Sequence, residues 1–171
     1  MIPIIKEAMH MTFSDSLAFK MLDYFSGMPK QAQHLLKVRD FALLIAHAEG
    51  LDAATCERIE IAALVHDIGI RPSLSKYGSS AGHYQELEGP SEARTMLDGC
   101  PTALVDRVCY LVGHHHTYDA IDGDDYQVLV EADFLVNFFE DDCSADAIRA
   151  ACGKIFRTET GKRLCQTMFA L

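Results

Sequence analysis

Hydrophobic positions along the chain recur every three or four residues, which is the spacing of one face of an α-helix. Leu17, Met21 and Phe25 form such a stripe just before Gly27. The spacing is helical rather than the strict alternation of apolar and polar residues that marks a half-buried strand. The pattern therefore predicts an all-α fold, with a first helix over about residues 14–26.

Residues that favour helix ends divide the rest of the chain. A second helix is predicted from Pro29 to Gly50, and a third begins with Asp52 as its N-cap and runs to the pair His66 and Asp67. Residues 71–89 contain several glycines and serines, so they are predicted to form a loop. A further helix is predicted over 126–140. Four more are predicted to begin at Pro90, Pro101, Ser144 and Thr158, and the first of these is predicted to end at Gly99.

Length and composition restrict the architecture and the partners. A chain of 171 residues with 49% hydrophobic content is enough for one well-packed domain and hardly two. We expect one domain over 1–171, with a core over about 31–140 and C-terminal helices over 144–171 packed on it. The 25 acidic residues outnumber the 15 basic ones, and the resulting net charge of −10 argues against nucleic acid polymers and anionic membranes as partners. A small anionic substrate is compatible with this charge if a bound cation supplies local positive charge.

Cysteines and the N-terminal segment bear on the compartment. The six cysteines lie far apart, without a Cys-x-x-Cys motif, as in a reduced cytoplasmic protein. The N-terminal segment contains Lys6 and Glu7 and lacks a basic n-region, so no secretory signal is expected. No apolar run approaches the length of a membrane-spanning helix. We therefore expect a cytoplasmic protein, and the sequence leaves homo-oligomerisation open.

Five polar residues interrupt the apolar stripes. His34, His115 and Asp133 stand at helical spacing from apolar neighbours, and the run "AALVHDIGI" ends on His66 and Asp67. Burying such groups is costly unless they are paired or bound to a metal. Any one of them could be an ordinary core histidine or a residue in a local turn. Together they form the mixed imidazole and carboxylate set that is typical of sites for Fe, Mn, Co, Ni or Zn.

The order of these residues resembles that of the HD-domain superfamily of metal-dependent phosphohydrolases, which is named for an adjacent His-Asp pair. His34, the doublet His66 and Asp67, and Asp133 match the family's metal ligands over about residues 31–140, and "EGLD" and "EADFLVN" agree with the family pattern. The resemblance implies a helical bundle with one or two divalent transition metal ions (Fe, Mn, Ni, Co or Zn). It also implies hydrolysis of a small phosphate ester or a nucleotide by a metal-activated water, with Asp67 as the bridging ligand if two ions bind.

Many members of this superfamily hold a second ion through histidines that lie between the doublet and the last aspartate. Gln85 stands where the first of these histidines is expected, and two neighbours are candidate replacements, Glu86 and His83. Three consecutive histidines match the later position, with His115 the first choice: His114, His115 and His116. Which of them bind metal is left open, and a remaining histidine such as His116 could protonate the leaving group.

Substrate contacts and two other functions also follow from the resemblance. Many members have a lysine directly after the His-Asp-Ile-Gly sequence, but Ile70 takes that place here, so Arg71 and Lys76 are the candidates for contacts with the substrate phosphate. Some proteins with this fold, such as myo-inositol oxygenase, use two irons for oxygen chemistry. A di-iron oxygenase and a non-catalytic metal or nucleotide sensor are therefore the alternatives to a hydrolase.

Overall fold

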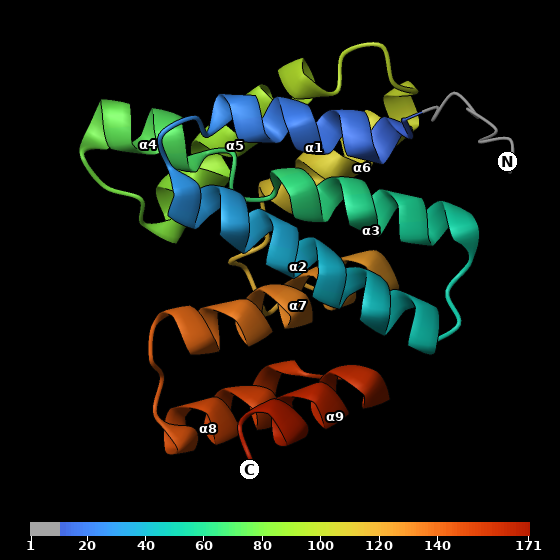
Figure 1. Ribbon diagram of the computed structural model, residues 1–171, viewed down its shortest axis with the longest axis vertical. Coiled ribbons are helices and arrows are strands. Elements are labelled where there is room, and N and C mark those ends of the chain that lie inside the picture. The colour runs from blue at the N-terminus through green and yellow to red at the C-terminus, as the bar shows by residue number, and fades with distance from the viewer. Residues whose placement is uncertain (1–10) are drawn as a thin grey trace, which may run out of the picture.

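The computed structural model describes residues 11–171, which form an all-α fold without strands, as the sequence predicts (Figure 1). The N-terminal segment that argues against a secretory signal lies mostly outside these residues. No described helix is both long and apolar enough to cross a membrane. The helices are α1 (Phe13–Tyr24), α2 (Pro29–Ala48), α3 (Ala53–Val65), α4 (Ile70–Tyr77), α5 (Gly82–Met96), α6 (Thr102–Val112), α7 (Asp124–Glu140), α8 (Ala145–Ile155) and α9 (Glu159–Met168).

The predicted helix caps are confirmed at three positions. The Asp52 carboxylate accepts hydrogen bonds from the backbone N–H groups of Ala54 and Thr55 and so begins α3. Ser144 and Thr158 cap α8 and α9 in the same way. These contacts satisfy N–H groups that have no partner inside the helix, which is why short polar residues mark helix starts.

The predicted loop over 71–89 is wrong, because α4 and most of α5 occupy this segment. Pro90 lies inside α5 rather than in the first turn of a helix. Gly78, with a φ of +65°, does end α4. Gly89 instead permits close packing, since a Cβ there would lie 2.6 Å from Cγ1 of Val112 in α6. In the sequence, Gly89 therefore indicates a loop, although its role is to let two helices pack closely.

Three helices form the centre of the bundle. α2 packs against α3 and α7, and their apolar faces supply much of the fully buried core. α5 packs on both α4 and α6, and this group lies to one side of the centre (Figure 1). The C-terminal ends of α3 and α6, the second turn of α2 and the middle of α7 thereby come together around one interior point.

The C-terminal helices are attached to α7 through a buried carboxylate. Glu131 is fully buried, and it accepts hydrogen bonds from the backbone N–H groups of Arg157 and Thr158 and from the Thr158 hydroxyl. These donors precede α9, which packs on α7 in Figure 1. Glu131 thus joins the C-terminal segment to the helix that also carries Asp133.

Candidate metal centre

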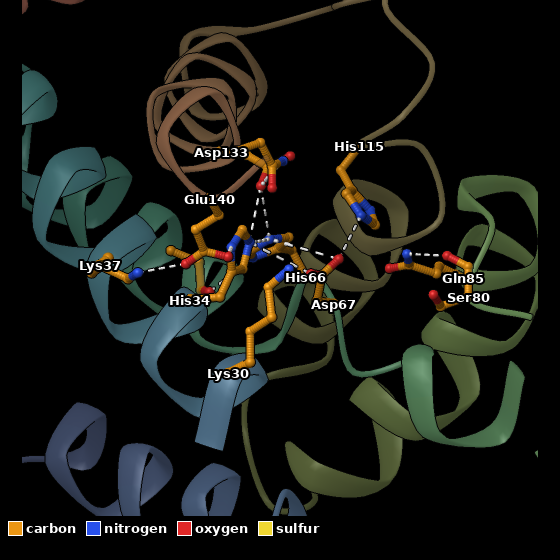
Figure 2. Close-up of polar contacts among 12 residues, drawn as sticks. Lys30, His34, Lys37, His66, Asp67, Ser80, Gln85, His115, Asp133 and Glu140 are labelled. Carbon is orange, nitrogen blue, oxygen red and sulfur yellow. Dashed lines mark hydrogen bonds and ion pairs between the residues drawn. The ribbon is translucent and has the colours of Figure 1, made fainter. Parts of the chain in front are cut away.

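Three buried side chains from three helices meet at the centre of the bundle (Figure 2). His34 comes from α2, His66 caps the C-terminal end of α3, and Asp133 comes from α7. The His34 Nε2 lies 3.0 Å from the Asp133 Oδ1 and 3.3 Å from the His66 Nε2. The His66 Nε2 lies 3.5 Å from the same Asp133 oxygen. These three donor atoms are close enough to bind one metal ion.

Asp67 connects this group to a second one. Its Oδ2 lies 3.5 Å from the His34 Nε2, and its Oδ1 lies 3.2 Å from the Nε2 of His115. Asp67, His115 and His116 offer donor atoms that all lie within 4.8 Å of one another. The structure therefore brings the four predicted ligands of the first ion together, and it places two of the three consecutive histidines beside them.

Hydrogen bonds at Nδ1 fix the orientation of three imidazoles. The Nδ1 of His66 is 2.9 Å from the Ala63 carbonyl oxygen, and the Nδ1 of His115 is 2.8 Å from that of Val112. The Nδ1 of His34 is 3.3 Å from a carboxylate oxygen of Glu140. A hydrogen on each Nδ1 leaves the Nε2 lone pair facing the centre, which is the tautomer that binds a metal.

Two supporting residues in α7 were not found from the sequence. The Asn137 amide donates a hydrogen bond to the Asp133 Oδ1 at 2.9 Å, and Glu140 orients His34 while it is paired with Lys37. Asn137 and Glu140 follow Asp133 by four and seven residues, so the three lie on one face of the helix. This spacing in the sequence could have identified both supporting residues. Such outer hydrogen bonds typically change metal affinity by about 10-fold to 100-fold when they are removed.

The charges in the cluster depend strongly on one another. Burial opposes the charged form of His34, but the hydrogen bond to Asp133 and the charges of Asp67, Asp133 and Glu140 raise its pKa to about 9. Burial likewise opposes ionisation of Asp67, yet His66 and His115 lower its pKa to about 2. Burial opposes ionisation of Asp133 as well, but its hydrogen bonds to His34 and His66 lower its pKa. Without a metal, protons on the imidazoles thus balance the buried carboxylates.

The donor set fits a divalent transition metal. Imidazole nitrogens and carboxylate oxygens suit Fe, Mn, Co, Ni and Zn. The Nε2 of His116 is buried and has no hydrogen-bond partner within residues 11–171. Burial and the neighbouring His115 lower the His116 pKa to about 4, so this nitrogen is available as a neutral ligand. A metal would satisfy it and would take over the role of the protons in balancing Asp67 and Asp133.

Comparison with known proteins supports the fold of the chain. No model of a protein family matches the sequence, and no curated protein matches it. A crystal structure of a protein from an uncultured Thermotogales bacterium, described as a predicted HD superfamily hydrolase, is similar with a TM-score of 0.65 and 25% sequence identity. The match covers 91% of this chain and 84% of the other. The chain has the HD-domain fold.

Within this HD-domain fold, Glu86 and His114 lie apart from the donor atoms of both groups. The Glu86 carboxylate accepts hydrogen bonds from the His116 backbone N–H at 2.9 Å and from the Thr117 hydroxyl at 3.1 Å. The His114 ring stacks on Tyr110, and its Nδ1 lies 2.7 Å from the Tyr110 carbonyl oxygen. Glu86 therefore holds the turn that carries the histidines instead of facing Asp67.

The two residues predicted to contact a substrate phosphate are engaged elsewhere. Arg71 donates a hydrogen bond to the Tyr24 carbonyl oxygen and lies over the Tyr24 ring. Lys76 forms an ion pair with Glu88. His83, the other candidate ligand, is exposed, and its ring lies against Tyr84. The structure does not bring any of these side chains to the cluster.

A cavity of about 460 Å³ opens beside the cluster of the HD-domain fold. This volume is within the range of pockets that bind small molecules. Its wall combines polar groups from both candidate ion positions with apolar surface from α7. The lining residues include Lys30, Gln31, His34, Asp67, Gln85, His116, Phe134 and Glu140.

Proposed function

We propose that the protein is a metal-dependent phosphohydrolase that acts on a small phosphate ester or a nucleotide. The proposal rests mainly on two neighbouring groups of side chains that can each bind a metal ion. Asp67 lies between them, at the wall of a cavity that is large enough for a small molecule. The similar protein of the same fold, described as a predicted HD superfamily hydrolase, supports a hydrolytic reaction. The mixed imidazole and carboxylate donors support a transition metal.

His34, His66, Asp67 and Asp133 would hold the first ion, and Asp67, His115 and His116 would hold a second. A divalent transition metal supplies a water molecule of lowered pKa and positive charge for the phosphoryl oxygens. We assign Asp67 the bridging position because its two oxygens face different histidines, His34 and His115.

The chain's own residues prepare this site in three ways. Asn137 holds the Asp133 carboxylate, and Glu140 holds the His34 ring, so neither ligand has to be ordered when metal binds. Glu86 fixes the turn that presents His116. We also assign His116 to the second ion in preference to protonation of the leaving group, because its lowered pKa keeps the imidazole neutral near pH 7.

The test is a panel of phosphate esters and nucleotides assayed with Mn²⁺, Co²⁺, Ni²⁺ or Fe²⁺. Hydrolysis should require the added metal and should be lost in Asp67→Asn, which keeps the size of the side chain. Asp98→Asn is the matched control, because Asp98 is exposed and lies outside the cavity. Hydrolysis that survives exhaustive chelation, or that persists in Asp67→Asn, would show that the proposed function is wrong.

A further inference from the structure

Lys30 is the one lysine or arginine among the described residues that line the cavity. The same wall carries three carboxylates, those of Asp67, Glu140 and Asp141. The Lys30 side chain is 65% exposed, and its ion pair with Asp141 spans 4.0 Å, too long for a hydrogen bond. Its ammonium group is therefore available to an anion that enters the cavity.

The position of Lys30 directs this charge toward the candidate metal centre. Lys30 lies four residues before His34, on the same face of α2. Figure 2 shows its side chain extending from α2 toward the cluster. Lys37, on the same helix, is instead paired with Glu140. An anion between the ions and α2 would thus meet Lys30 and no competing lysine or arginine of the cavity wall.

The first turn of α2 adds further donors on the same side. The helix begins with Pro29, and Met28 before it provides no side-chain cap. The backbone N–H groups of Lys30 and Gln31 are among those that a helix leaves without an internal partner. Both residues line the cavity. The N-terminal end of a helix also carries partial positive charge, which favours bound phosphate.

An independent feature on the α5 side of the cavity indicates that a ligand belongs there. The Gln85 side chain is only 7% exposed, yet its Oε1 has no hydrogen-bond partner among the residues that the structure describes. Its Nε2 donates a hydrogen bond to the Ser80 carbonyl oxygen at 2.7 Å, which fixes the amide orientation. A buried acceptor of this kind is normally satisfied, so a donor from a bound molecule would complete it.

We propose that Lys30 and the first turn of α2 bind the phosphate group of the substrate, and that Gln85 accepts a hydrogen bond from a hydroxyl or N–H group of the same molecule. This inference rests on the proposed function, because it places the phosphate beside the same ions. The cavity of about 460 Å³ is large enough for a sugar phosphate or a nucleotide. The substrate class is therefore a small phosphomonoester whose body carries a hydrogen-bond donor.

Calorimetric titration of inorganic phosphate into the full-length, Mn²⁺-loaded protein tests the role of Lys30 without requiring turnover. Lys30→Met should weaken phosphate binding about tenfold or more, since a hydrogen bond to a charged group is lost. Lys30→Arg should retain most of the affinity. Lys154→Met is the control, because Lys154 is exposed on α8 and outside the cavity. Unchanged binding in Lys30→Met, or a loss in Lys76→Met instead, would overturn the inference.

Ribose 5-phosphate, compared with inorganic phosphate, tests the role of Gln85. Gln85→Met should weaken the binding of ribose 5-phosphate severalfold and leave that of inorganic phosphate unchanged. An equal effect on both ligands, or no effect on either, would overturn the assignment of Gln85. Because binding and turnover are measured separately, phosphate binding that depends on Lys30 in a protein without hydrolysis would reject only the proposed function. Metal-dependent hydrolysis with unchanged phosphate binding in Lys30→Met would reject only the inference.

Discussion

Replacing Asp67 with alanine should abolish the stabilisation that metal gives to the folded protein. The Asp67 oxygens lie 3.5 Å from the Nε2 of His34 and 3.2 Å from the Nε2 of His115, so one substitution removes a ligand from both candidate positions. Metal at 100 times its dissociation constant stabilises the wild type by about 2.7 kcal/mol. For a chain of this length, that corresponds to an increase of roughly 5–10 °C in melting temperature.

The assay is thermal unfolding followed by circular dichroism, with Mn²⁺ and with a chelator. The decisive quantity is the metal-induced shift within each variant, because Asp67→Ala also changes the charge balance of the metal-free cluster. We expect a shift of less than about 2 °C in Asp67→Ala and a wild-type shift in Asp98→Asn, since weaker binding leaves little free energy for stabilisation. A wild-type shift in Asp67→Ala would refute the assignment of Asp67 as a shared ligand.

Three further predictions address other parts of the structure. His115→Ala should reduce the bound metal from about two ions per chain to about one, whereas His114→Ala should leave it unchanged. The same metal content in both variants, measured by elemental analysis, would contradict this. Glu131→Ala should lower the free energy of unfolding in urea by about 2–5 kcal/mol because it removes the buried acceptor of the backbone N–H groups of Arg157 and Thr158, and Glu131→Gln should cost much less; similar losses in the two variants would argue against this contact. Burial opposes ionisation of Asp125, but Arg107 and Arg58 lower its pKa, so its contribution to stability is present above about pH 4 and is lost as the pH falls through the lowered pKa. Asp125→Asn should therefore weaken the acid dependence of urea unfolding, and an unchanged dependence would contradict the role of this carboxylate.

The fold could be predicted largely from local patterns. Apolar residues at helical spacing indicated α1 and α2, because one face of each of these helices is buried. The strongly apolar run over 126–140 indicated α7, which is buried on most sides. Short polar caps such as Asp52 gave the starts of helices, since the capping contact is made within three residues. Both signals depend on neighbours in sequence, so no tertiary information was required.

The segment of α4 and α5 could not be predicted in this way. Gly89 has a helical environment, and its lack of a side chain matters because Val112 approaches it from another helix. Pro90 is tolerated within α5 although proline usually ends a helix. Gly89 and Pro90 are explained by contacts between helices, and the spacing of residues along one helix does not reveal such contacts.

The candidate site was predictable where a polar residue interrupts an apolar stripe. His34 and Asp133 were found for this reason, and the structure brings them within 3.0 Å. The roles of Glu86 and His116 were harder to separate, because a carboxylate can bind a metal or a backbone N–H equally well. The path of the chain after α6 separates the two roles: Glu86 accepts a hydrogen bond from the His116 backbone N–H, while the His116 ring faces Asp67.

The central claim is that this HD-domain fold holds divalent transition metal around Asp67 for hydrolysis. The most direct measurement is elemental analysis of the protein purified under low oxygen, with the oxidation state determined spectroscopically. We expect about two divalent transition metal ions per chain in the wild type. The absence of stoichiometric transition metal, even after reloading, would contradict the claim of a metal centre, and two irons in a mixed-valence state would favour an oxygenase over the proposed hydrolase.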